Sequence, residues 1–446
     1  MPRLTRDRTT WLTYAQLGLW GFFLYGFGPV VPLLRDEQGT SAAVAGLHST
    51  GIAVGALAGG ALFAPVARRY GRGPAIWLGL AGVTAGVTAL GLLHPLPATI
   101  AAVAVVATFG MMVISGVNVV LTARHGPAAP AALTEANAAC AGMGILAPLT
   151  IGVTVDAGLG WRPVMAVEVG LITLVALAAL TFRVRLPHGA PATAAAAAPV
   201  GVAPASAAPA PVAAAVAPAA VAPAAVASGP RGIMVSSRSG GTARRQGPGA
   251  GTRVASARLP RAYWIAWVLM SVTGSIEVCL SLWTAGVLRD HAGLSTGGAS
   301  AGVAAIVGGM FVGRAAGGRA ALRWPPVPLL LGALTVSLAG FTLFWASPIG
   351  WLAVTGLVVL GLGNALHYPL AISIALAAAG TATDRAAGWS SYSMGVGFGV
   401  APVVLGWVAD GVGPHLAFLL LPAFIAVAVL LTVRLGRALA PGVAPA

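Results

Sequence analysis

Residues 34–41 read LRDEQGTS, and residues 288–295 read LRDHAGLS. The two stretches are offset by 254 residues (288 minus 34), and the same register holds over most of the chain. It pairs Gly55, Gly59, Arg69, Ala147-Pro148, Gly152 and Asp156 with Gly309, Gly313, Arg323, Ala401-Pro402, Gly406 and Asp410. Because charged residues are rare in this chain, acidic and arginine matches in one register indicate an internal duplication.

The composition is that of a membrane protein. Of the 446 residues, 58% are hydrophobic and only 8% are charged, whereas a water-facing surface needs about a quarter of its residues charged. Most of the perimeter must therefore face lipid. The two cysteines, Cys140 and Cys279, lie inside apolar stretches, which indicates small buried side chains and no disulfide framework.

Twelve apolar stretches are long enough to span a bilayer as helices. Six lie in the first half, at residues 11–34, 41–67, 74–93, 97–123, 132–156 and 162–184. Six lie in the second half, at residues 262–288, 298–322, 326–346, 350–378, 386–409 and 416–435. The sequence thus predicts an all-α membrane protein of twelve transmembrane helices. An even number of spans per half predicts two six-helix repeats related by a pseudo-two-fold axis along the membrane normal.

The position of the arginines sets the expected orientation. All 25 basic residues are Arg, and the formal net charge is +15. Given twelve spans, the short loops and termini on one side hold 14 Arg, while the other side holds Arg35, Arg162 and Arg289. Cytoplasmic loops carry the excess of positive charge, so we expect both termini in the cytoplasm and the chain in the inner membrane. Arginines at the ends of apolar stretches argue against a nucleic-acid partner.

Two helical domains are expected, at residues 1–186 and 261–446, joined by a cytoplasmic linker at 187–260. Residues 187–230 are nearly all Ala, Pro, Val, Gly and Ser. Proline lacks an amide donor and alanine adds little hydrophobic drive, so this part is a solvated segment and not a further span. Residues 231–261 carry seven Arg and are expected to contact anionic lipid.

The loop after the second span has the sequence Ala64-Pro65-Val66-Ala67-Arg68-Arg69-Tyr70-Gly71-Arg72. Here the chain resembles the major facilitator superfamily, whose signature in this loop has a Gly, an Asp four residues on, then Arg, any residue, Gly and Arg. Arg69, Gly71 and Arg72 fit, whereas Ala64 replaces the Gly and Arg68 replaces the Asp. The resemblance covers both halves. It implies a secondary transporter for a small molecule that works by rocking of its halves, with Arg68, Arg69, Gly71 and Arg72 as a gating loop.

A second stretch, Ala147-Pro148-Leu149-Thr150-Ile151-Gly152, is a degenerate form of the signature found in proton-coupled antiporters of that family. Its twin recurs at residues 401–406, so we interpret it as a proline-shaped packing element. The alternative interpretation, a marker of export, stays open. Import and export are therefore both compatible with the sequence.

Glu277 lies near the middle of its span, where a charge costs roughly 2.5 to 3.5 kcal/mol on insertion scales. Thr273, Ser281 and Thr284 share its helical face, which predicts a polar stripe along a water-filled cavity. The repeat places Phe23 at the equivalent position, so the shared fold does not require the acid. One hypothesis makes Glu277 a proton or substrate site. The other makes it the structural ion-pair partner of Arg314.

Further candidate binding residues are polar groups within spans. Asn364, His367 and Tyr368 fall within one helical turn before Pro369, and His48 lies in the second span. In the family that the chain resembles, the first, fourth, seventh and tenth helices line the cavity. By that resemblance the candidates also include Gln16, Trp20, Tyr25, Ser115 and Asn118.

Small residues and acids elsewhere have simpler interpretations. Gly51, Gly55 and Gly59 recur every fourth residue, as do Gly309, Gly313 and Gly317, and such faces could form a sliding contact between halves or pack statically. Glu135, Glu168, Asp156 and Asp410 lie near the ends of spans, where interfacial solvation is expected to accommodate them.

Other classes of function are disfavoured. Gly298-Ala299-Ser300-Ala301-Gly302 has the spacing of a hydrolase nucleophile elbow, but an elbow needs a strand leading into a helix and none is expected there. Neither a phosphate-binding loop nor paired metal-ligand spacing is found, so we expect no enzyme, no cofactor and no metal. The sequence predicts a monomeric, proton-coupled transporter, with an efflux antiporter or a non-transporting membrane scaffold or sensor as alternatives.

Overall fold

The computed structural model describes residues 4–184, 186, 259–321, 323–379 and 383–439. Nearly all of the linker expected at 187–260 lies outside these residues. Within them, twelve helices are long and apolar enough to cross a membrane, and no strand is present. The expected all-α architecture of twelve membrane-spanning helices is therefore confirmed.

The N-terminal half consists of six long helices and one short 3-10 turn. The helices are α1 (Arg8–Gln38), α2 (Ala42–Tyr70), α3 (Arg72–Leu92), α4 (Leu96–His125), α5 (Ala129–Asp156) and α6 (Arg162–Thr181), with η1 (Gly126–Ala128) before α5. Their bounds differ from the predicted spans mainly by extending a few residues beyond the apolar stretches.

The C-terminal half repeats this order with two interrupted spans. Its helices are α7 (Arg261–Asp290), α8 (Thr296–Gly302), α9 (Ala304–Ala321), α10 (Pro326–Ala346), α11 (Gly350–Ala379), α12 (Thr383–Val412), α13 (Pro414–Ala417) and α14 (Leu420–Leu439). The eighth span, predicted as one helix, is divided at Val303 into α8 and α9. The twelfth span is formed by α13 and α14.

The repeated stretch that begins the sequence argument forms the same turn in both halves. Gly39 ends α1 with φ +60°, and Gly293 follows α7 with φ +66°, a left-handed conformation that favours glycine. Two residues further on, Ser41 caps α2 by accepting from the Val44 amide, and Ser295 caps α8 in the same way. The repeated sequence thus forms the same turn and the same helix cap in both halves.

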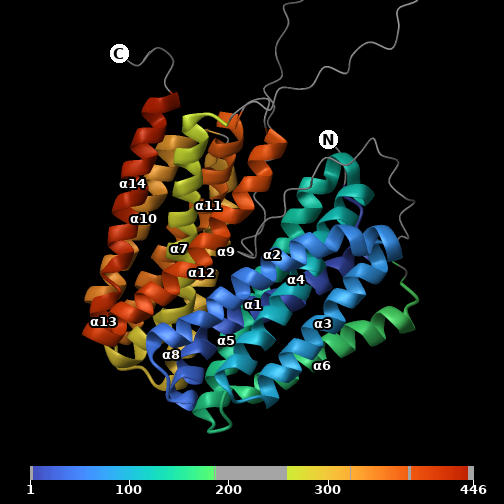
Figure 1. Ribbon diagram of the computed structural model, residues 1–446, viewed down its shortest axis with the longest axis horizontal. Helices are drawn as coiled ribbons and strands as arrows, with labels where there is room; N and C mark the ends of the chain where they lie inside the picture. Colours follow the sequence, from blue (N-terminus) through green and yellow to red (C-terminus); the bar gives the residue numbers. More distant parts are fainter. Residues whose placement is uncertain (1–3, 185, 187–258, 322, 380–382, 440–446) are drawn as a thin grey trace, which may run out of the picture.

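The two halves meet at one end of the molecule and diverge at the other (Figure 1). We call the end that holds α8 and α13 the closed end, and the end that holds the termini the open end. At the closed end, Arg289 Nη1 of α7 lies 2.9 Å from Asp36 Oδ2 of α1. Closer to the middle, the Thr50 hydroxyl of α2 donates to the Gly399 carbonyl of α12 at 2.6 Å. The contacts between halves therefore concentrate at the closed end.

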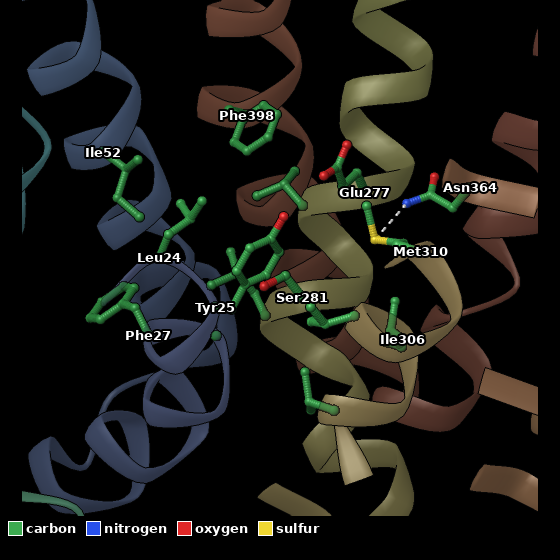
Figure 2. Close-up of a pocket in the computed structure, with 15 residues that line it drawn as sticks. Leu24, Tyr25, Phe27, Ile52, Glu277, Ser281, Ile306, Met310, Asn364 and Phe398 are labelled. Carbon is green, nitrogen blue, oxygen red and sulfur yellow. Dashed lines mark hydrogen bonds between the residues drawn. The ribbon is translucent and has the colours of Figure 1, made fainter. Parts of the chain in front are cut away.

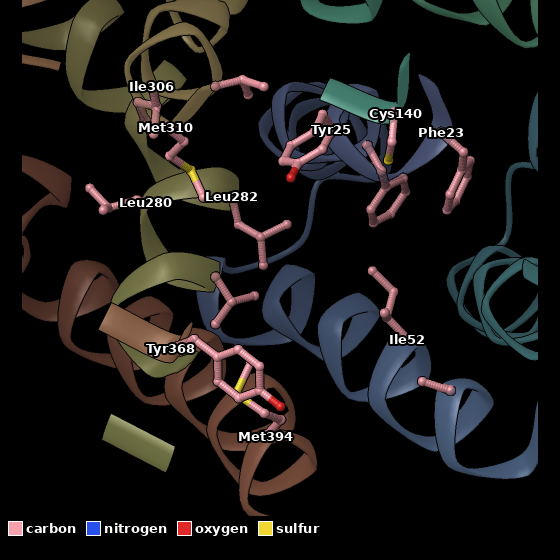
Figure 3. Close-up of a cluster of buried hydrophobic side chains, with 14 of the residues drawn as sticks. Phe23, Tyr25, Ile52, Cys140, Leu280, Leu282, Ile306, Met310, Tyr368 and Met394 are labelled. Atoms are coloured by element: carbon pink, nitrogen blue, oxygen red, sulfur yellow. The ribbon is translucent and has the colours of Figure 1, made fainter. Parts of the chain in front are cut away.

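The buried core continues from one half into the other. Figure 3 shows Phe23, Tyr25, Ile52 and Cys140 of the N-terminal half facing a group from the C-terminal half. That group contains Leu280, Leu282, Ile306, Met310, Tyr368 and Met394. Packing between the halves is thus mainly apolar, which gives dispersion contact without fixing one orientation by many hydrogen bonds.

The glycine ladders do not form a sliding contact between halves. A Cβ at Gly55 would overlap the Ala104 carbonyl of α4, and one at Gly313 would overlap the Leu362 carbonyl of α11. Both partners belong to the same half as the ladder. The expected sliding role is wrong, because the small residues serve close helix packing inside each half.

Interfacial solvation accounts for only some of the acids near span ends. Glu168 of α6 is fully buried at 0% exposure, so the expectation is wrong there. Glu135 pairs with Arg6 and accepts from the Tyr14 hydroxyl. Asp156 and Asp410 are exposed, but each also accepts hydrogen bonds from the opposite half.

Candidate functional site

A cavity continuous with solvent lies between the two halves, and the space inside it, open solvent included, is about 640 Å³. The N-terminal half contributes Leu24, Tyr25, Phe27, Gly28 and Ile52. The C-terminal half contributes Glu277, Val278, Ser281, Leu282, Val303, Ile306, Val307, Met310, Asn364 and Phe398 (Figure 2). The cavity is thus shared by both halves.

Close packing of α1 against α7 positions the cavity wall. Gly28 makes this possible, because a Cβ there would overlap the carbonyl oxygen and hydroxyl of Ser281. One turn before Gly28, Tyr25 points toward the cavity, and one turn before Ser281 lies Glu277 (Figure 2). The glycine therefore brings a phenol from one half near a carboxylate from the other.

Glu277 lines the cavity and is partly buried, as the predicted polar stripe requires. Ser281, on the same face, also lines the cavity. Thr273 and Thr284 are buried, and the Thr273 hydroxyl donates to the Met270 carbonyl at 3.0 Å. Only the central part of the stripe therefore faces the open space.

Arg314 of α9 joins this group from the C-terminal half. Its guanidinium donates a hydrogen bond to the Tyr25 hydroxyl, and the Tyr25 side chain is also within electrostatic reach of Glu277. Arg314 Nε and Nη1 are buried, with no hydrogen-bond partner among the residues that the structure describes. The structure thus brings together a phenol (Tyr25), a carboxyl group (Glu277) and a guanidinium cation (Arg314) at the junction of the halves.

The helix α11 contributes one of its three candidates to the cavity wall. Asn364 lines the cavity, and its Nδ2 lies 3.7 Å from Met310 Sδ. Tyr368 is 5% exposed and is not among the lining residues. His367 is buried on another face, with Nε2 3.0 Å from the Ser337 hydroxyl of α10. His367 does not line the cavity.

The candidates on α2 and α4 lie apart from the cavity wall. His48 is fully buried, with Nδ1 2.9 Å from the Ala45 carbonyl and Nε2 3.0 Å from the Thr99 hydroxyl. Ser115 is 9% exposed and Asn118 is partly buried, and neither is among the lining residues. Of the four helices that the resemblance implies, α1, α7 and α11 contribute to the lining.

On α1, two further candidates are buried away from the lining. Gln16 has neither side-chain polar atom bonded to any described residue, and Trp20 Nε1 likewise has no such partner. The Trp20 ring packs on α4, where a Cβ at Gly110 would overlap it. Both side chains are buried, and neither lines the cavity.

The gating-loop residues lie at the open end. Arg68 and Arg69 end α2 with exposed side chains, and the Arg69 guanidinium lies 5.3 Å from the Tyr70 ring centre. Gly71 has φ +92° and makes the turn into α3, which begins at Arg72. These residues form a short connection between two helices of one half.

Sequence reasoning missed the apolar lining contributed by α2, α9 and α12. Ile52, Ile306, Met310 and Phe398 line the cavity, yet they resemble dozens of other apolar residues in spans. No composition signal separates a lipid-facing isoleucine from a cavity-facing one.

Comparisons with known proteins agree with this architecture. The model of the major facilitator superfamily matches residues 16–391. A glucose/galactose transporter of Brucella abortus biovar 1 (strain 9-941) is 35% identical over 156 residues, which are 32% of this chain and 35% of that protein. The same figures hold for the protein of that name in Brucella abortus (strain 2308). The chain thus matches about a third of the length of these curated relatives.

Solved structures share the whole fold at low identity. The nucleoside transporter NupG has a TM-score of 0.66 and 13% identity, with 96% of this chain and 97% of that chain covered. A bacterial homologue of the human lysosomal transporter Spinster, in an inward-facing and unoccupied conformation, has a TM-score of 0.68 and 14% identity, with 97% and 98% covered. With a family model that covers most of its length, the chain belongs to the major facilitator superfamily, a family of transporters.

Proposed function

We propose that the protein is a proton-coupled secondary transporter of an amphipathic small molecule. The observation that carries the proposal is the position of Glu277 on the wall of a cavity between two halves, which Tyr25 of the other half and Asn364 also line. A titratable group in the middle of a membrane has a large cost when charged and so needs a function or a partner.

Proton coupling follows from a change of surroundings. When the cavity opens to water, the charged carboxylate is stabilised by solvent. When the cavity closes, the low dielectric favours the neutral, protonated form unless a cation is near. Arg314, bonded to Tyr25, is the cation positioned to modulate this balance. Glu277 is thus proposed as the proton site, and the lining residues Tyr25 and Asn364 as substrate contacts.

Movement would occur by rocking of residues 1–186 against residues 261–446. The halves touch at the closed end and diverge at the open end (Figure 1), which supports a cavity that opens toward the side of the termini. The excess of arginine on that side supports a cytoplasmic location for it in the inner membrane. We propose a monomer surrounded by lipid, since both walls of the cavity come from one chain and no second chain is needed to complete it.

The substrate class follows from the cavity wall. Four lining residues are polar, Tyr25, Glu277, Ser281 and Asn364, and the remaining eleven (15 minus 4) are apolar or glycine. An apolar body would pack on this wall, and a single cationic or hydrogen-bonding head would meet Glu277. Transport outward in exchange for protons suits such a compound, because proton and cation would compete for one carboxylate.

The name of the Brucella relatives supports a second candidate, hexose transport. A hexose carries hydroxyl groups around its whole ring, and a site that leaves several unpaired loses binding free energy. The mostly apolar wall therefore favours the amphipathic substrate over the hexose.

Thermal stabilisation of the purified protein distinguishes the candidates. Methylphenylpyridinium, a cation with apolar rings, should raise the melting temperature, whereas glucose and uridine should not. Stabilisation by glucose alone would replace the proposal by hexose transport. Absence of any response across a broad panel would favour a membrane scaffold with the same fold.

A further inference from the structure

The repeated motif with Ala-Pro, Gly and Asp has a counterpart in the structure at the closed end. Asp156 ends α5 and Asp410 lies near the end of α12, and the two are equivalent in the repeat. Asp156 Oδ1 accepts from the Gly297 amide at 3.0 Å, and its Oδ2 accepts from the Ser295 hydroxyl at 3.0 Å. Both donors belong to the opposite half.

Asp410 makes the contacts that the repeat places opposite those of Asp156, with residues of the N-terminal half. Its Oδ1 accepts from the Ala42 amide at 2.7 Å and its Oδ2 from the Ala43 amide at 3.0 Å. The Ser41 side chain is also hydrogen-bonded to it. Ser41 and Ala43 are the repeat equivalents of Ser295 and Gly297 (41 plus 254, 43 plus 254). Each half therefore supplies one carboxylate and receives the other.

The glycine of the same motif allows the approach. A Cβ at Gly152 would lie 2.7 Å from the Gly297 carbonyl oxygen, and a Cβ at Gly406 would overlap the Ala42 carbonyl. Without these glycines the backbones could not come within reach of one another. The motif at residues 147–156 and 401–410 thus combines close approach with a charged acceptor one turn further on.

We propose that Asp156 and Asp410 form a paired latch that stabilises the state closed at this end. Its hydrogen bonds to backbone amides join only opposite halves, so they exist in the closed state and are lost when the halves separate. Because rocking about an axis between the halves opens both contacts together, one rigid-body motion must release both carboxylates. The latch sets the ratio of the two access states and needs no contact with the substrate.

The arrangement predicts matched contributions from both sides. Both carboxylates are exposed, so water competes for their hydrogen bonds. Each contact therefore shifts the equilibrium between the closed and opened states of this end by only a few-fold. Asp156→Asn and Asp410→Asn should each raise the fraction of molecules in which the closed end is open by about threefold. The double variant should raise it by about tenfold, because separated contacts add in free energy.

A buried residue near the latch can report how often the closed end opens. Ala53 of α2 is 7% exposed and packs on Gly399 of α12, across the junction of the halves. Ala53→Cys is placed in a full-length chain in which Cys140 and Cys279 are replaced by alanine. A membrane-impermeant thiol reagent is added on the side of sealed vesicles that the closed end faces. Its labelling rate follows the population of molecules in which the closed end has opened, even when that population is small.

The control is an exposed acid at the same end whose partners lie in its own half. Glu37 Oε1 is 2.5 Å from Arg162 Nη2, and Glu37 Oε2 accepts from Trp161 Nε1 at 3.3 Å. Glu37→Gln removes a carboxylate charge from this end and should leave the labelling rate at the parent value. A cysteine at the exposed Leu159 checks that the reagent reaches all variants equally.

The expected result is a labelling rate at Ala53→Cys that rises in both single variants and rises further in the double variant. A folded double variant that labels at the parent rate would overturn the latch. Should the double variant fail to fold, the single variants carry the same test, since each keeps one carboxylate. No substrate is used, so this outcome is independent of the transport proposal.

Discussion

The Tyr25 hydroxyl of α1 accepts a hydrogen bond from the Arg314 guanidinium of α9, so one side-chain pair joins the two halves beside the cavity. The pair is charge-assisted and lies where water is scarce, which strengthens it relative to a surface contact. Arg314 has Gly60 at its repeat position. The contact is thus specific to one side of the duplicated fold.

Tyr25→Phe removes this hydroxyl and keeps the ring. We expect the free energy of unfolding to fall by about 1.5 to 3 kcal/mol, because a buried guanidinium loses an acceptor. Substrate binding should weaken as well, since Tyr25 lines the cavity. Melting of the purified protein and ligand-induced stabilisation measure the two effects. A variant indistinguishable from wild type in both would show that the pair is incidental.

The glycine ladders give a test with a control on the same helix. Gly309 of α9 would place a Cβ into the Val358 carbonyl of α11, whereas Gly308 has open space around its Cβ position. Gly309→Ala should cost about 1 to 3 kcal/mol through overpacking. Gly308→Ala should be neutral or stabilise by up to about 1 kcal/mol through helix propensity. Equal melting temperatures for the two variants would contradict the packing assigned to the ladder.

Glu168 provides a contrast to Glu277. It is fully buried, and neither carboxyl oxygen has a hydrogen-bond partner among the described residues. An unpartnered polar group in an apolar setting costs roughly 1 to 3 kcal/mol, so Glu168→Met should raise the melting temperature. Transport should persist because Glu168 does not line the cavity. Loss of proton-driven transport in a stable Glu168→Met protein would make it a second proton site.

The repeat and the apolar periodicity predicted the fold well for a physical reason. A bilayer demands long apolar helices, so span existence can be read from composition, and α7 differs from its predicted range by only a few residues. The division between α8 and α9 was not predicted. It is one residue long: Val303 keeps helical dihedral angles (φ −62°, ψ −28°), and its amide donates to the Ser300 carbonyl, three residues back, as in a 3-10 turn.

Side-chain direction around a helix was the part that sequence could not supply. His48 and His367 lie in spans like Glu277, but each has a hydroxyl within hydrogen-bonding distance on an adjacent helix of its own half. The orientation of each imidazole ring depends on the position of its hydroxyl partner, Thr99 or Ser337, in the folded protein. Glu277 was predictable because its own helix carries polar neighbours at helical spacing.

The central claim is that Glu277 couples a proton to substrate movement, and one measurement tests it most directly. Glu277→Gln keeps the shape and removes the titratable charge, and Glu168→Gln is the matched control in another span. Proteoliposomes are assayed for methylphenylpyridinium accumulation driven by a pH gradient and for its exchange without a gradient. We expect Glu277→Gln to lose accumulation by at least about tenfold while exchange remains measurable, with Glu168→Gln like wild type. Undiminished pH-driven accumulation in a folded Glu277→Gln protein would contradict the account.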